Sequence, residues 1–160
     1  MTGTRAEGRQ GFALVVYRED GRWEAGVLPD RLVGDLDGLV AAVRQQPGGG
    51  SAIGLVDVAD EFFVALRVLP DGEPRVLLSD ASAATDWDLA AAAFGRIQPD
   101  AVPPDDVVPA GDLTLFDDLG LDSGELLAIL SDMDAYADEM IGSIAGRVGF
   151  ADVFERAITQ

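Results

Sequence analysis

The chain has 160 residues, of which 29 are acidic and 11 are arginine, and it contains no lysine, histidine or cysteine, so its net charge is −18. The missing residue types exclude a thiol nucleophile, a Ser-His-Asp triad, a His/Cys metal site, a Walker A loop and a lysine Schiff base, and we expect a non-enzymatic protein without a cofactor. The negative charge repels phosphate backbones and anionic lipid surfaces, which argues against direct binding of nucleic acid or membranes.

Apolar residues make up 48% of the chain, as is typical of a globular protein. Residues 1–10 are polar, and we expect them to form a disordered tail. No stretch reaches the roughly 18 consecutive apolar residues that a transmembrane helix needs. Without cysteine there is also no disulfide framework of the kind that exported domains use, so the expected location is the cytoplasm.

The first part of the chain predicts a β-hairpin followed by a helix. Residues 11–18 alternate apolar side chains with a period of two, an acidic turn with glycine follows at 19–21, and residues 22–28 continue as a second strand. Residues 35–46 place leucine and valine at helical spacing, and the Pro-Gly-Gly-Gly run at 47–50 ends that helix.

Three more strands and a second helical pattern follow. Residues 52–58 and 61–69 predict two apolar strands joined by a tight turn. The next turn is expected at 70–74, because proline fixes φ and glycine tolerates positive φ. Residues 75–79 then form a fifth strand, and residues 80–97 have a helical pattern.

This second helix is expected to have Asp80 as its N-cap and to turn Trp87, Ala91 and Phe94 toward the sheet. The element order is then ββαβββα. Nearly all strand pairs are joined by links of hairpin length, which favours an antiparallel five-stranded sheet. With both helices on one face of that sheet, the predicted fold class is α+β.

The other face of the predicted sheet is also apolar. If alternate residues of the fourth strand face the helices, Phe63 and Leu69 lie on the opposite side, where they need a cover. The C-terminal segment, a second subunit or a partner protein could each supply it. Phe63 and Leu69 are therefore candidate partner-binding residues, and a homodimer through this face is one alternative.

The last third of the chain is predicted to be a helical subdomain. Residues 98–111 hold four prolines and three aspartates, as an extended linker does, and they separate a sheet domain at 11–97 from the subdomain at 112–160. Four segments of the subdomain have helical patterns: 112–119, 122–131, 135–148 and 151–158. So small a unit makes a poor core alone, and we expect it to dock on the sheet or on another protein.

The negative charge is concentrated in this last third. Residues 100–160 carry 14 acidic residues and two arginines, a net charge of −12, whereas the net charge of residues 1–99 is −6. Such a field favours a protein partner with a basic surface. Four acidic residues are candidates for contacting that partner: Asp105, Asp106, Asp117 and Asp118.

One acidic segment has a second interpretation. Residues 116–123, FDDLGLDS, resemble the phosphopantetheine attachment segment of acyl carrier proteins, which makes a carrier or small-molecule function centred on Ser123 an alternative. Gly124 replaces the leucine that usually follows this serine. The simpler interpretation is that Asp122 caps a helix and forms a capping box with Glu125.

Four segments taken together resemble one protein family. They are FALVVYREDGRWEA, DEFFVALRVLPDGEPRVLLSDASAA, AGDLTLFDDLGLDSGELLAIL and IAGRVGFADVFE, and their order and spacing are similar to those of the tRNA adenosine deaminase-associated proteins of high-GC Gram-positive bacteria. That family takes its name from genes that lie beside a tRNA adenosine deaminase gene. The resemblance implies an accessory protein with the deaminase as one candidate for the basic partner, and it assigns no catalytic or binding residue.

Overall fold

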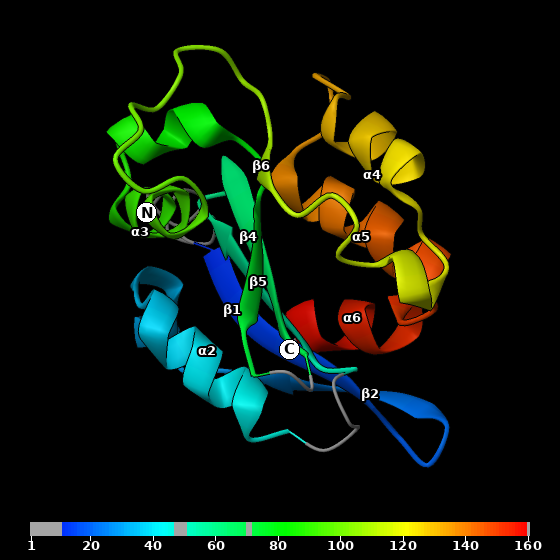
Figure 1. Cartoon of the computed structure of the whole chain (residues 1–160). Coiled ribbons are helices and arrows are strands. Elements are labelled where there is room, and N and C mark those ends of the chain that lie inside the picture. The colour runs from blue at the N-terminus through cyan, green and yellow to red at the C-terminus, as the bar shows by residue number, and fades with distance from the viewer. Residues whose placement is uncertain (1–10, 47–50, 70–71, 160) are drawn as a thin grey trace, which may run out of the picture.

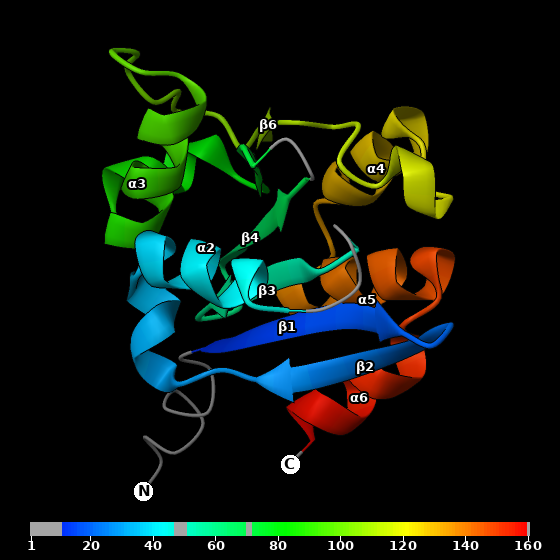
Figure 2. The ribbon, with the colours of Figure 1, turned by 60° about the horizontal axis from the view of Figure 1, so that its bottom comes forward.

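The computed structural model describes residues 11–46, 51–69 and 72–159, so the predicted tail at 1–10 and the glycine run at 47–50 lie outside the described residues. A central sheet lies between two layers of helices (Figures 1 and 2). The predicted α+β class with an antiparallel sheet is confirmed.

The sheet has six antiparallel strands in the order β2-β1-β3-β4-β5-β6. The strands are β1 (Gly11–Glu19), β2 (Arg22–Val27), β3 (Ile53–Val58), β4 (Phe62–Val68), β5 (Pro74–Leu78) and β6 (Ala110–Gly111). The first five fall at the predicted positions. Hairpin turns at 20–21 and 59–60 have positive φ at both central residues, which matches the right-handed twist of the strands that they join.

The sixth strand, at the end of the segment 98–111, corrects the predicted count of five strands. Ala110 and Gly111 pair with Leu78 and Leu77 of β5. Gly111 has a φ of +108°, and a Cβ there would lie 2.2 Å from the carbonyl oxygen of Val76, so only glycine fits against this edge of β5. A two-residue strand is too short to show a period-two pattern, so the sequence does not reveal it.

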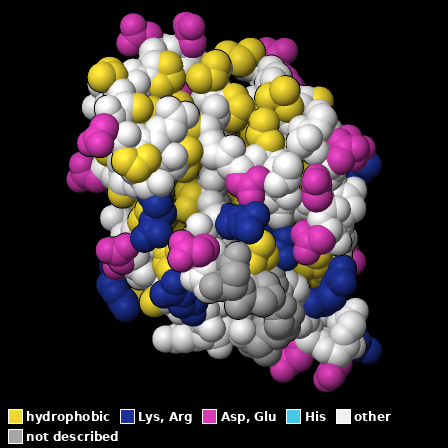
Figure 3. Space-filling view, viewed as in Figure 1, with side chains coloured by type: hydrophobic (Ala, Val, Ile, Leu, Met, Phe, Trp, Pro, Cys, Tyr) yellow, Lys and Arg dark blue, Asp and Glu magenta, His cyan; other side chains and the backbone are white. Residues whose placement is uncertain are grey.

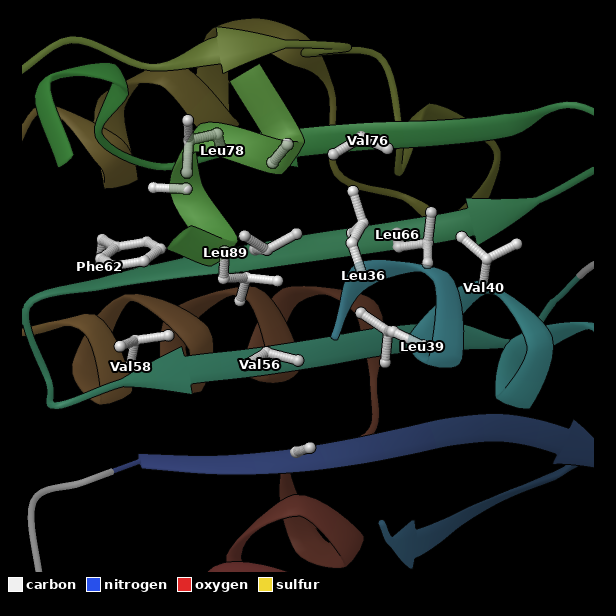
Figure 4. Close-up of a cluster of buried hydrophobic side chains, with 14 of the residues drawn as sticks. Leu36, Leu39, Val40, Val56, Val58, Phe62, Leu66, Val76, Leu78 and Leu89 are labelled. Carbon is white, nitrogen blue, oxygen red and sulfur yellow. The ribbon is translucent and has the colours of Figure 1, made fainter. Parts of the chain in front are cut away.

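The first helical layer covers one face of the sheet. It consists of η1 (Asp30–Gly34), α2 (Leu36–Arg44), η2 (Ala81–Thr85) and α3 (Asp88–Ile97). Figure 4 shows buried side chains of this layer and of the sheet directed toward one another: Leu36, Leu39 and Val40 of α2, Leu89 of α3, and Val56, Val58, Phe62, Leu66, Val76 and Leu78 of the strands. The prediction that both helices pack on one face is confirmed.

The second of these helices begins later than predicted. The carboxylate of Asp80 accepts a hydrogen bond from the N–H of Ser82 (2.9 Å) and so caps the 3-10 turn η2, whereas α3 begins at Asp88. Trp87 therefore precedes the helix. Of the three side chains expected to face the sheet, Ala91 is exposed and Phe94 is buried in the core, while Trp87 is only partly covered.

The C-terminal helices cover the second face of the sheet. They are α4 (Ser123–Leu130), α5 (Ala137–Val148) and α6 (Ala151–Ile158), preceded by the 3-10 turn η3 (Asp117–Leu119). These helices share a buried cluster with seven residues of the sheet: Leu14, Val16, Ile53, Leu55, Phe63, Ala65 and Leu77. The same chain thus supplies the cover that the second face needs. The division into a sheet domain and a helical subdomain stays a prediction.

A buried arginine ties the segment before α4 to the sheet. Arg67 of β4 donates to the carbonyl oxygen of Leu115 (2.6 Å) and to both carboxylate oxygens of Asp118 (2.7 and 3.1 Å). Hydrogen bonding to Arg67 lowers the pKa of Asp118 below its usual range. This charge-assisted, bidentate contact holds η3 on the second face.

Candidate protein-binding site

One end of the sheet carries a concentration of acidic side chains. Three chain segments meet there: the β3–β4 turn at 59–61, the η2–α3 junction at 85–88, and the α4–α5 loop with the start of α5 at 131–139. They hold eight acidic residues and no arginine: Asp60, Glu61, Asp86, Asp88, Asp132, Asp134, Asp138 and Glu139. We call this surface the acidic end.

Contacts of the β3–β4 turn hold these segments together. The N–H groups of Ala137 and Asp138 donate to the carbonyl oxygen and to the carboxylate of Asp60, at 3.4 and 2.9 Å. On the other face of the sheet, the ring centroid of Trp87 lies 6.0 Å from that of Phe62, the first residue of β4. The acidic end is therefore built from both helical layers and the turn between them.

Three large apolar side chains project from the acidic end. Trp87 is 37% exposed, Met133 is 70% exposed and Tyr136 is 63% exposed. Tryptophan, tyrosine and methionine are residue types that interface cores favour. Figure 3 shows hydrophobic and acidic side chains over the upper part of the molecule, whereas lower down acidic side chains lie among dark blue ones. Exposed apolar side chains surrounded by carboxylates are complementary to a protein surface that is basic.

A buried carboxyl group lies beneath the β3–β4 turn. Asp57 of β3 accepts a hydrogen bond from the N–H of Asp60 (2.8 Å). Burial, followed by the negative charges of Asp60 and Asp138, raises the pKa of Asp57 to about 7. At neutral pH the carboxyl group of Asp57 is therefore partly protonated, and it fixes the turn that carries the acidic end.

Arginines gather at the opposite end of the sheet. Five of the described arginines are there: Arg18 and Arg22 beside the β1–β2 turn, Arg44 at the end of α2, and Arg67 and Arg75 on β4 and β5. Arg44 donates to the carbonyl oxygen of Gly72 in the β4–β5 connection (2.9 Å). None of these five arginines lies at the acidic end, so a charged partner that approaches that end meets its negative charge.

Two of the predicted partner-binding residues lie at the same end of the sheet as the acidic end. Asp105 and Asp106 are exposed in the connection between α3 and β6, which also exposes Val102. The N–H of Ala81 donates to the carbonyl oxygen of Val108 (2.7 Å), so this connection runs along η2 where β5 ends. Asp105 and Asp106 therefore add to the negative charge at this end.

The structure does not bring the other predicted residues to this surface. Asp117 and Asp118 lie on η3, on the opposite side of the molecule from the α3–β6 connection (Figures 1 and 2), and Asp118 is engaged by Arg67. Leu69 is half-buried beyond the far end of β4. Phe63 is fully buried under the C-terminal helices, so a partner or a second copy cannot reach it in the folded chain, contrary to the prediction.

Ser123 is the first residue of α4. The carboxylate of Asp122 accepts a hydrogen bond from the N–H of Glu125 (2.8 Å), and the Glu125 side chain accepts one from the N–H of Asp122 (3.4 Å). The predicted capping box is confirmed, and it explains this acidic segment without a prosthetic group. A carrier function at Ser123 stays an untested alternative.

Sequence reasoning missed Trp87, Met133 and Tyr136 as surface anchors. Trp87 was expected to face the sheet, because apolar residues at helical spacing indicate a core face. The available signal was local: Trp87 stands between Asp86 and Asp88, and Met133 is likewise flanked by aspartates on both sides. This signal alone does not decide exposure, because Leu36 also stands between two aspartates and is buried in the core.

None of the described helices is long and apolar enough to cross a membrane. In the same part of the chain, no three histidine, cysteine, aspartate or glutamate side chains are grouped so that they could hold a metal ion.

Comparison with known proteins gives one consistent result. A family model described as Rv3753c-like tRNA adenosine deaminase-associated protein matches residues 11–151. Protein Rv3753c of Mycobacterium tuberculosis (strain ATCC 25618 / H37Rv) is 40% identical over 159 residues, which cover 97% of this chain and 91% of that protein. No solved structure gives a significant match.

Proposed function

Because the chain belongs to the family of Rv3753c-like tRNA adenosine deaminase-associated proteins, we propose that it is a non-catalytic accessory protein that binds a basic surface of a tRNA adenosine deaminase through its acidic end. The family description supplies the candidate partner. The geometry supplies the candidate surface. Such a partner would also place the protein in the cytoplasm, where tRNA is modified.

The observation that carries the proposal is the set of exposed apolar side chains within a surface of one charge sign. Trp87, Met133 and Tyr136 are exposed among eight carboxylates, in segments without arginine. Large apolar side chains at the surface of a folded chain mark interaction sites when they lie together and are rimmed by polar groups. The rim here is negative, so the partner's complementary rim must be positive.

The two kinds of side chain have different roles in this proposal. The carboxylates attract a basic surface over about one Debye length and set its orientation, so they act mainly on the association rate. Trp87 and Tyr136 lose water on contact and act mainly on the dissociation rate. Asp60 accepts hydrogen bonds from the N–H groups of Ala137 and Asp138 at the start of α5, which keep the β3–β4 turn in place, so little ordering is needed on binding.

The proposal is tested with purified components. A purified tRNA adenosine deaminase is immobilised, and binding of the full chain is measured at low and at raised ionic strength. Replacing both Trp87 and Tyr136 by alanine is expected to weaken binding by at least about tenfold, as hot-spot truncations do. Raised ionic strength should weaken binding of the native chain as well.

Ile158→Ala is the matched control, because Ile158 on α6 is 36% exposed, nearly the same fraction as Trp87, but lies outside the acidic end. This variant should bind as the native chain does. Absence of binding at low ionic strength would refute the deaminase as partner. Equal weakening by Ile158→Ala and by the double substitution would refute the acidic end as the surface.

A further inference from the structure

The sheet also has an edge strand whose outer side is unoccupied within the described part of the chain, where β2 pairs only with β1. The N–H of Leu28 donates to the carbonyl oxygen of Ala13 (2.8 Å), which fixes the alternation of the antiparallel ladder. By that alternation the even-numbered residues of β2 bond to β1. Trp23, Ala25 and Val27 therefore turn their N–H and C=O groups outward.

A groove of about 350 Å³ lies between this edge and helix α6. Its lining combines the apolar residues Ala25, Val27, Val153 and Ala157 with the charged residues Glu24 and Arg156, and polar atoms supply more of its surface than apolar atoms do. Val27 is 57% exposed, an unusual fraction for a large apolar residue in a strand. A row of outward backbone donors and acceptors, beside a groove that also offers apolar side chains, is the arrangement that accepts an added strand.

We propose that β2 receives an extended segment of a basic partner protein as an added antiparallel strand. The backbone of the added strand forms hydrogen bonds with the backbone N–H and C=O groups of Trp23, Ala25 and Val27. In such a ladder, the residues directly opposite these three point their side chains to the same face, toward α6, so they are apolar and fill the groove. The alternate residues face Glu24 on the other side of the sheet and are basic.

Charge distinguishes a basic segment from a second copy of this chain. A twofold axis at Ala25 would set the two Glu24 side chains diagonally across the new ladder. It would also bring the two α6 helices together, and each presents Asp152 and Glu155 beside the groove. Like charges across a ladder destabilise it, and each copy carries a net charge of −18. A basic segment meets the opposite charges of Glu24, Asp152 and Glu155, while Arg156 is a like charge that also lines the groove. The partner's basic charge rests on the proposed function.

The test measures amide hydrogen exchange by NMR on the full chain, with a short synthetic peptide of alternating arginine and valine as the probe. We expect exchange at Trp23, Ala25 and Val27 to slow by at least about tenfold on saturation. Exchange at Glu24 and Gly26, which already bond to β1, should not change. The same peptide with N-methylated valines keeps its charge but lacks the donors that β2 needs, and it should give no protection.

Two substitutions at one position refine the test. Val27→Pro removes an outward N–H without removing a bond to β1, and Val27→Thr keeps both the N–H and the branched Cβ as the matched control. The peptide should bind Val27→Pro at least about tenfold more weakly than Val27→Thr. If Val27→Pro does not fold, the comparison of the two peptides decides.

The proposal is overturned if both peptides protect β2 equally, if neither does so at about 1 mM, a concentration that would reveal even weak binding, or if folded Val27→Pro and Val27→Thr bind alike. Replacement of Trp87 and Tyr136 should leave peptide binding unchanged. Failure at β2 is thereby distinguishable from failure of the acidic end to bind the deaminase.

Discussion

The buried carboxyl group beneath the acidic end gives a stability effect with a defined sign. The pKa of Asp57 is raised from 3.8 to about 7 in the folded chain. Between these two values, the folded chain binds a proton that the unfolded chain does not. The free energy of unfolding therefore falls as the pH rises from about 4 to 7, and this contribution is constant at higher pH.

The size of the effect follows from the shift. A difference of about three pKa units corresponds to at most about 4 kcal/mol, at about 1.4 kcal/mol per unit. Asp57→Asn removes the titration and keeps an oxygen that can accept the N–H of Asp60. We expect this variant to be more stable than the native chain by about 2–4 kcal/mol at pH 8, and to differ from it by less than about 1 kcal/mol at pH 4.

Urea unfolding of both proteins from pH 4 to pH 8 measures this difference directly. Taking the difference removes the contribution of the other carboxylates, which titrate in both proteins. If the two curves of unfolding free energy against pH run parallel, the carboxyl group of Asp57 does not titrate in this range, and the account of a partly protonated group beneath the β3–β4 turn is wrong.

Three further substitutions have expected outcomes. Asp118→Asn should lower the stability at neutral pH, because the pKa of Asp118 is lowered by Arg67, and the deficit should shrink as the pH falls below about 4 in the same urea titration. Gly111→Ala should lower the free energy of unfolding by more than about 2 kcal/mol, because the new Cβ would meet the carbonyl oxygen of Val76. A variant with a larger side chain at position 111 that is as stable as the native chain would contradict this. Phe63→Ala should cost about 3–5 kcal/mol by thermal or urea unfolding. Below its unfolding temperature this variant should still bind the deaminase. If the folded variant does not bind, Phe63 contributes to the interface after all.

Most of the sheet could be predicted because its signals are local. β1 and β2 alternate apolar side chains around a turn whose Asp-Gly pair tolerates positive φ. β3, β4 and β5 are separated by equally clear turns. β6 could not be predicted, since a two-residue strand is specified by the edge of β5 on which it lies rather than by its own sequence.

The cover of the second face could not be decided from the sequence. An apolar stripe at helical spacing shows that a helix buries one side, but it does not show against what. Phe63 has the same strand pattern whether helices of its own chain or a partner cover it. For the same reason Trp87 was predicted to face the sheet, although the structure leaves it partly exposed just before α3.

The candidate acidic residues differ in their surroundings, for a reason that the composition of the chain cannot show. Asp105 and Asp118 belong to the same negative third of the chain. In the structure Asp118 is neutralised by Arg67, which comes from a strand 51 positions earlier, while Asp105 remains exposed. Only the fold reveals which carboxylates are paired with arginine and which face outward.

Hydrogen exchange of the chain in complex with a purified tRNA adenosine deaminase, at low ionic strength, tests the central claim most directly. Protection is expected at the β3–β4 turn, at the η2–α3 junction and in the α4–α5 loop, and it should disappear at high ionic strength. A complex that protects only η3 or the arginine end, or the absence of any complex, would contradict the assignment of the acidic end as the partner-binding surface.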